Sequence, residues 1–254
     1  NDAIDHLVSI GVMNIVTADT PEEVSAELLE CLSDEGMQEY IPQFETAKLP
    51  LQPEPDPKAE SEETVPYKWN AKNIKIAVAG TQRRSGVTVT AFNMAEWLKA
   101  RGADVCYMEM NTTRSLQMLL NIYDAERMDE HYSLDGLDCY LTNEPDRDYH
   151  FIICDCGEMQ SPPTVFREAE IRLLCGSILP YEIPTFHKAL KACGSMKLTK
   201  IGICIPKEFQ GYCVSLFGKD IQIANVSHDL FSNNINGHIY RPLVQEYIAG
   251  TKRL

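Results

Sequence analysis

The stretch of sequence that decides the fold is "IKIAVAGTQRRSGVTVTAFNMAEWLKARGADVCYMEMN", residues 74–111. An apolar run leads into a short polar loop, a helical pattern follows, and a second apolar run ends in acid and amide side chains. This order predicts a strand, a loop, a helix and a second strand. In a phosphate-binding loop of the form G-x-x-x-x-G-K-[ST] a lysine precedes the hydroxyl residue, but here Val87 lies between Gly86 and Thr88.

From residue 71 onward, short apolar runs alternate with helical stretches. The runs are continuous rather than alternating, which indicates strands that are covered on both faces. We therefore expect residues 71–254 to form an α/β domain with a mostly parallel sheet sandwiched by helices. The predicted strands are "IKIAVAG" (74–80), "ADVCYMEM" (103–110), "YHFIICDCG" (149–157), "EIRLLCGSI" (170–178), "KIGICIP" (200–206) and "DIQIANV" (220–226).

Residues 1–46 predict a helix, a strand and a second helix. In the second helix Thr20 suits the N-cap and Pro21 the first helical position. This segment is either the closing part of an α/β domain or a helical addition to the main domain. Because the chain begins at Asn1 rather than methionine, we expect it to be part of a longer protein. The three elements are "AIDHLVSIG" (3–11), "VMNIVTA" (12–18) and "DTPEEVSAELLECLS" (19–33).

The composition of the chain argues against several classes of function. Residues 47–70 are rich in proline and acids and predict a solvated linker. The net charge of −14 opposes nucleic-acid binding, which rewards clustered lysine and arginine. No apolar run approaches the roughly 18 residues of a membrane span. The nine cysteines are scattered, with Cys106, Cys154 and Cys204 in apolar runs, as expected of reduced core thiols. Cys154 and Cys156 lack C-x-x-C spacing, so a metal site there is disfavoured.

The loop from Gly80 to Thr88 would direct main-chain N–H groups and the positive end of a helix dipole at an anion. Gly86 permits close approach, and Thr88 lies where a hydroxyl meets Mg²⁺. Asp155 ends the apolar strand "YHFIICDCG", where a carboxylate suits a metal-bound water near phosphates. A strand–loop–helix turn that binds nothing is an alternative interpretation of the bare motif.

With these motifs together, residues 72–254 resemble the ParA/MinD superfamily of P-loop ATPases, which have a deviant Walker A motif. The helical stretch "TAFNMAEWLKARG" (90–102) resembles the family's T-x-A-x-N-L-A continuation, and "VCYMEMN" (105–111) lies where the family has an apolar strand and D-x-D. The family's loop, K-G-G-V-G-K-T-T, aligns with Gln82, Arg83, Arg84, Ser85, Gly86, Val87, Thr88 and Val89.

Within the superfamily the sequence is most similar to the bacterial CpaE/TadZ branch, associated with positioning pilus-assembly machinery. Members of that branch often replace the second loop lysine and carry a receiver-like domain, whose C-terminal part residues 1–46 would be. Lysine-poor relatives in Firmicute mobile elements are a second match. The resemblance implies ATP on Gly80 and residues 82–89, and Mg²⁺ supported by Thr88 and Asp155. It also implies a cytoplasmic protein with protein partners, a homodimer across the nucleotide face, and membrane association only through partners.

The departures from the family pattern affect catalysis most. Gln82 replaces the lysine that reaches across a dimer interface, and Val87 replaces the lysine that holds the terminal phosphates. Asn111 takes the position of the acid that orients the attacking water, and Pro206 that of an asparagine near the adenine. An absent charge-assisted hydrogen bond weakens phosphate binding by about ten- to a hundredfold. A lost carboxylate acting on water costs on the order of 10²–10⁴ in rate.

We therefore expect a positioning or assembly factor that acts through partner binding and hydrolyses ATP weakly or not at all. Two alternatives stay open. One is a slow ATPase in which Arg83 or Arg84 supplies the missing charge; the other is a nucleotide-free scaffold in a pilus, secretion or conjugation system. Arg83 and Arg84 are equally consistent with solvated loop residues. Glu109 is expected to point to solvent at its strand end rather than to lie near a metal, and His150 to be a surface or packing residue rather than a base.

The C-terminal "IYRPLVQEYIAGTKRL" (239–254) has apolar residues at helical spacing followed by two basic residues. Relatives of MinD end in a membrane-seeking amphipathic helix. Here the helix is short, carries few basic residues and contains Pro242, so packing of Leu243, Val244, Tyr247 and Ile248 on the core is favoured.

Overall fold

The computed structural model describes residues 15–18, 20–32, 66–141, 144–225, 227 and 229–250, and the chain divides into two compact units after Ser61. In the first unit, helix α2 spans Pro21–Cys31, and the Thr20 side chain accepts a hydrogen bond from the Glu23 amide. The predicted N-cap is thus confirmed. Residues 15–18 form no strand, so the strand predicted over 12–18 is wrong for this part. The helix predicted over 3–11 lies outside the described residues.

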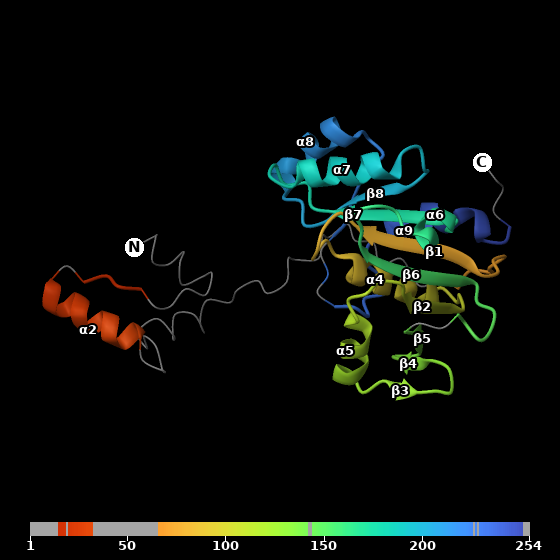
Figure 1. The fold of residues 1–254 in the computed structure, drawn as a ribbon, viewed down its shortest axis with the longest axis horizontal. Helices are drawn as coiled ribbons and strands as arrows, with labels where there is room; N and C mark the ends of the chain where they lie inside the picture. The colour runs from red at the N-terminus through yellow and green to blue at the C-terminus, as the bar shows by residue number, and fades with distance from the viewer. Residues whose placement is uncertain are drawn as a thin grey trace. The chain divides into compact units, whose positions relative to one another are not determined.

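The second unit contains a nine-stranded sheet in the order β3-β4-β5-β2-β6-β1-β7-β8-β9. Figure 1 shows most of these strands side by side in that order. Seven strands, from β5 to β9 across the sheet, pair in parallel, whereas β4 pairs antiparallel with both β3 and β5. The strands are β1 (Ile74–Gly80), β2 (Val105–Glu109), β3 (Glu126–Arg127), β4 (Tyr132–Leu134), β5 (Leu137–Tyr140), β6 (Phe151–Glu158), β7 (Ile171–Gly176), β8 (Thr199–Gly202) and β9 (Gln222–Ile223).

Helices flank both faces of this sheet. On β1, Ile76 and Val78 pack in a cluster with α4 and α9, whereas Ala77 and Ala79 pack in a cluster with α6 and α7. The alternation of side chains along one strand therefore serves two apolar layers. The predicted α/β class with a mostly parallel sheet between helices is confirmed. The helices are α4 (Val87–Ala100), α5 (Ser115–Ile122), α6 (Thr164–Glu168), α7 (Ile183–Cys193), α8 (Lys207–Phe217), α9 (Gly237–Val244) and the short 3₁₀ helix η1 (Gln245–Tyr247).

All six predicted strands are present, although β8 ends at Gly202 and β9 has only two residues. The sequence patterns did not predict β3, β4 and β5. These strands have two, three and four residues and form an antiparallel meander beside β2. Both residues of β3, Glu126 and Arg127, are exposed at the open edge. Strands this short offer no apolar run long enough to be recognised.

The C-terminal segment packs on the sheet domain. Val244 is fully buried, and Leu243 and Tyr247 pack against the same cluster, so their predicted core role is confirmed. Ile248 forms an antiparallel bridge with Trp69, which itself packs on this cluster. Residues 66–70 of the segment expected to be a linker thus lie against the main unit. Within the described residues, no helix is long and apolar enough to cross a membrane.

Candidate phosphate-binding site

The loop after β1 has the strand–loop–helix geometry that the sequence predicts. Two main-chain hydrogen bonds fix its base: the Thr81 amide donates to Cys175 O (2.9 Å), and Gly80 O accepts from the Met159 amide (2.9 Å). Helix α4 begins directly after Gly86, which has a φ of 76° and provides no side-chain cap. The first turn of α4 therefore keeps its free N–H groups directed at the loop.

The loop presents unpaired donors. Within the described part of the chain, no main-chain N–H group of residues 82–86 donates a hydrogen bond. The hydroxyls of Thr81 and Ser85 are also without a partner there, although these residues are only 6% and 3% exposed. Buried polar groups are normally paired. A run of free amides at a helix N-terminus, with an unpaired hydroxyl beside it, is the arrangement that binds an oxyanion.

The interior of the loop is partly filled by its own side chains. Val87 lies at the position of the missing lysine but points into the core and is 7% exposed. A Cβ atom added to Gly80 would overlap the Ser85 hydroxyl and lie 2.6 Å from Val87 Cγ2. A Cβ on Gly86 would lie 3.2 Å from Ile203 Cγ2. Gly80 is therefore required by close packing and Gly86 by its positive φ, and Val87 cannot act on a phosphate.

The remaining loop residues differ in their surroundings. Arg83 and Arg84 are exposed, and neither forms a hydrogen bond or ion pair with any described residue. Arg84 has a φ of 61°, at a position where the family has glycine. The Gln82 amide donates to the Glu182 carboxylate, which lies at the N-cap of α7. Gln82 is thus directed toward its own chain, and Val89 lies in the first turn of α4.

Asp155 lies on β6 with no solvent contact and accepts four hydrogen bonds. Its Oδ2 accepts from Thr88 Oγ1 (2.8 Å) and from the Tyr107 hydroxyl (2.7 Å). Its Oδ1 accepts from Asn111 Nδ2 (3.1 Å) and from the Gly157 amide (2.8 Å). The structure therefore brings together three residues that the sequence assigned to one site, Thr88, Asp155 and Asn111.

Tyr107 is the member of this cluster that the sequence did not reveal. It lies in β2, fully buried, and its ring packs on Phe92 with centroids 4.3 Å apart. Burial, and then the charge of Asp155, raises the pKa of the Tyr107 hydroxyl well above its ordinary value. The phenol therefore stays protonated and donates to Asp155. A tyrosine within an apolar strand is typical of a core residue. The one hint in the sequence is that Tyr107 lies two positions from Glu109, so both side chains point to the same face of the sheet.

These residues do not fit the metal site that the resemblance implies. A carboxylate offers about four lone-pair positions, and protein donors fill all four on Asp155. Thr88 Oγ1 donates its hydrogen to Asp155 and keeps its two oxygen lone pairs, so the mismatch lies at Asp155. As arranged, Asp155 cannot accept a hydrogen bond from a metal-bound water.

Two other acid–base candidates have structural roles. Glu109 is 6% exposed, and its Oε1 accepts from Ser115 Oγ (2.9 Å) and the Leu116 amide (3.0 Å). It caps α5, so the expectation that it faces solvent was wrong. His150 Nδ1 accepts from the Asp104 amide (2.7 Å), in agreement with the predicted packing role.

The cysteines follow the sequence analysis with one exception. Cys154 and Cys156 are buried, and burial raises the pKa of the Cys154 thiol to about 12 and that of Cys156 further. Cys204, expected in a core strand, is exposed because the chain turns there with a φ of 55°. Pro206, at the position of the adenine-side asparagine, is the N-cap of α8.

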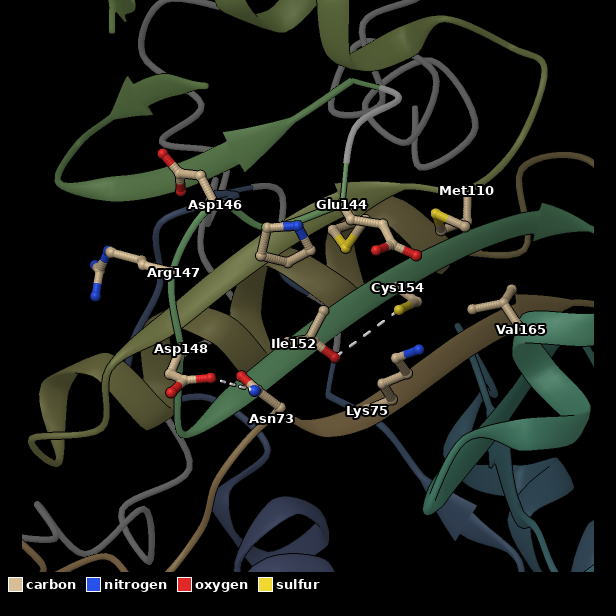
Figure 2. A pocket seen from close by; sticks show the side chains of 12 residues that line it. Asn73, Lys75, Met110, Glu144, Asp146, Arg147, Asp148, Ile152, Cys154 and Val165 are labelled. Atoms are coloured by element: carbon tan, nitrogen blue, oxygen red, sulfur yellow. Dashed lines mark hydrogen bonds between the residues drawn. The ribbon is translucent and has the colours of Figure 1, made fainter. Parts of the chain in front are cut away.

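A separate cavity of about 610 Å³ lies on the sheet face away from α4 (Figure 2). Ile152 and Cys154 of β6 form its floor, and Lys75, Glu144 and Arg147 are among its charged lining residues. No residue of the loop 80–88 lines it. The cavity is thus distinct from the candidate phosphate site.

Comparisons with known proteins give likenesses of fold only. Neither protein-family profiles nor curated protein sequences match the chain. A ParA family ATPase from Chlorobium tepidum TLS is 13% identical, with 65% of this chain and 90% of that chain covered and a TM-score of 0.44. A plasmid partition protein from Borrelia burgdorferi B31 bound to AMPPNP is 13% identical over 69% and 95% of the two chains, with a TM-score of 0.45. The MinC:MinD cell division protein complex of Aquifex aeolicus is 13% identical over 65% and 87%, with a TM-score of 0.46.

The packing at Gly80 predicts the effect of one added methyl group. Gly80→Ala should lower the free energy of unfolding by about 1–3 kcal/mol, because Ser85 and Val87 fill the space. Gly211→Ala is the matched control: Gly211 is in α8 with open space around it, and alanine there should stabilise by about 0.5–1 kcal/mol. Urea unfolding measures both. Equal stability of Gly80→Ala and wild type would show that the loop is not packed in this way.

Asn111→Asp tests the cluster around Asp155. It replaces a donor 3.1 Å from Asp155 Oδ1 with a second carboxylate, which should raise the pKa of one acid in the folded state above its unfolded value of about 4. The folded variant then binds an extra proton, so its stability falls as pH rises through the raised pKa. Urea unfolding at pH 5 and pH 7.5 should show a deficit relative to Asn111→Ala that is larger at pH 7.5. A deficit independent of pH would contradict the assignment.

Proposed function

We propose that residues 71–254 are a ParA/MinD-type P-loop domain that acts as a positioning or assembly factor through partner binding, with weak or no ATP hydrolysis. The observation that carries this proposal is the set of unpaired main-chain N–H groups of residues 82–86, beside the unpaired Ser85 hydroxyl, at the N-terminus of a 14-residue helix. These donors suit phosphate oxygens, and the spacing of Gly86 and Thr88 supports a nucleoside polyphosphate such as ATP or ADP.

Arginine is the cation that the loop offers to the ligand. Arg83 and Arg84 are exposed and form no ion pair with a described residue, so binding a phosphate would break no existing contact. Guanidinium groups match phosphate oxygens in two-point contacts. In this proposal they supply the charge that the family obtains from lysine at the positions of Gln82 and Val87.

The same geometry opposes fast hydrolysis. Val87 is packed in the core, and Asn111 donates its amide to Asp155 and accepts from the Thr113 amide with its carbonyl. Asn111 therefore offers no carboxylate to orient an attacking water, a loss on the order of 10²–10⁴ in rate. We propose that the nucleotide, where it binds, stabilises a conformation that partners recognise.

The finer assignment is to the CpaE/TadZ branch, acting in the bacterial cytoplasm on pilus-assembly machinery, with membrane association only through partners. Support comes from Val87 at the second lysine position and from a separate unit, with helix α2, ahead of the P-loop unit. Because Gln82 is bonded to Glu182 of its own chain, a homodimer across the nucleotide face would meet the exposed Arg83 and Arg84 instead.

A nucleotide-free scaffold is the second candidate. The Ser85 hydroxyl and Val87 Cγ2 both lie against Gly80, so the protein's own side chains occupy part of the loop interior. In this alternative the fold is retained for partner binding alone, and the free amides of residues 82–86 bind water.

A thermal unfolding experiment separates the two candidates. ATP and ADP at about 100 times their dissociation constant should stabilise the folded state by about 2.7 kcal/mol, which raises the Tm of a chain of this size by about 5–10 °C. Adenosine, which lacks phosphates, is the control and should have no such effect. An unchanged Tm with ATP and ADP up to millimolar concentration favours the scaffold.

The arginine assignment has its own test. The double substitution Arg83→Ala with Arg84→Ala should weaken ATP binding in calorimetric titration by about ten- to a hundredfold. Arg127→Ala, which removes an exposed charge from β3, is the matched control and should leave binding unchanged. An unaltered affinity in the double variant would exclude the arginines. Phosphate release in the same samples, with and without Asp155→Ala, distinguishes a slow ATPase from a binding module.

A further inference from the structure

Asp155 is held by donors that cannot easily move away. The Gly157 amide is part of β6, and the Tyr107 hydroxyl belongs to a fully buried ring packed on Phe92. Asn111 is fixed from its other side, because its Oδ1 accepts from the Thr113 amide at 2.9 Å. Oδ1 thus has two fixed donors, and Oδ2 has one fixed donor, the Tyr107 hydroxyl, together with the Thr88 hydroxyl. The side chain has no contact with solvent.

The packing around the cluster leaves no room for rearrangement. Gly157 has a φ of 62°, and a Cβ atom there would lie 2.9 Å from Asn111 Cβ. Asn111 is therefore pressed against the main chain that follows Asp155. Rotation of the Thr88 hydroxyl aside, a movement that freed a lone pair of Asp155 would have to displace Tyr107 from the core or Asn111 from this contact.

Mg²⁺ makes specific demands that this cluster does not meet. The ion requires near-octahedral oxygen ligands and usually keeps several waters, which donate hydrogen bonds to nearby carboxylates. Asp155 has no lone pair for such a water, and Glu109, the acid at the end of the neighbouring strand, caps α5. Asp155, which the resemblance assigns to metal support, therefore has no lone pair left for a metal-bound water.

We propose that the phosphate loop binds its ligand as a metal-free oxyanion, with main-chain amides and arginine in place of Mg²⁺. This inference rests on the proposed function, and it replaces the expectation of a metal on Thr88 and Asp155. A divalent ion on the terminal phosphates would compete with Arg83 and Arg84 for the same oxygens. The preferred ligand class is a free polyphosphate, such as ATP without its metal, rather than the magnesium complex.

The test is a calorimetric titration of the full chain with ATP, once in EDTA and once in excess MgCl₂. The dissociation constant in EDTA should be equal to or lower than that in MgCl₂. Binding that is about tenfold or more tighter in MgCl₂, the size of one charge-assisted contact, would overturn the inference. No binding under either condition contradicts the proposed function instead, so the two failures are distinguishable.

Tyr107→Phe tests whether saturation of Asp155 by protein donors is what excludes the metal. This substitution keeps the ring and removes one of the four donors, so Asp155 regains a lone pair. Magnesium should then tighten ATP binding severalfold relative to EDTA. Tyr240→Phe is the matched control, because Tyr240 is a buried tyrosine of α9 and is not one of the four donors to Asp155. If the magnesium-to-EDTA ratio is the same in both variants, saturation of Asp155 does not exclude the metal and the inference fails.

Glu158→Gln tests whether Glu158, the exposed acid at the end of β6, supports a bound metal. The inference requires that this variant keeps the wild-type ratio of affinities in MgCl₂ and EDTA. A change in that ratio would show that Glu158 supports a bound metal, and would overturn the metal-free assignment.

Discussion

Asp155 carries a carboxylate into the middle of the sheet, between β1 and β2, where it has no contact with water. Such a group costs several kcal/mol to bury unless it is fully hydrogen-bonded. Thr88 brings a donor from α4, Tyr107 from β2 and Asn111 from the loop that follows β2. Hydrogen bonds to this one side chain therefore join α4, β2 and the loop after β2 at the carboxyl edge of the sheet. The loop after β1 leads directly into α4 and is positioned by that helix.

The departures from the family pattern are consistent with one another. An acid at the position of Asn111 would repel Asp155, whereas the amide donates to it. The Tyr107 hydroxyl occupies the lone pair of Oδ2 that Thr88 leaves free. Val87 then contributes an apolar side chain to the core where a lysine would need an anion. Under the proposed function, neutral hydrogen-bond donors and an apolar side chain stand where the family has charged groups.

The sequence predicted the central strands because continuous apolar runs mark strands buried on both faces. It also assigned Thr88 and Asp155 to one site, and the resemblance gave Asn111 the position of the water-orienting acid; the three side chains are in contact through Asp155. The strands β3 to β5 escaped prediction because they are too short for any period to show. Glu109 was misjudged because the position of the α5 N-terminus, which buries it as a cap, is set by tertiary packing. No pattern in the sequence predicts that the Ser85 hydroxyl lies against Gly80.

The two-residue strand β3 closes one margin of the sheet with Glu126 and Arg127, both exposed. An edge strand this short and this charged presents few free backbone groups, which disfavours strand pairing between molecules. Association of two molecules through this edge, of the kind that builds cross-strand ladders in fibrillar aggregates, is therefore disfavoured.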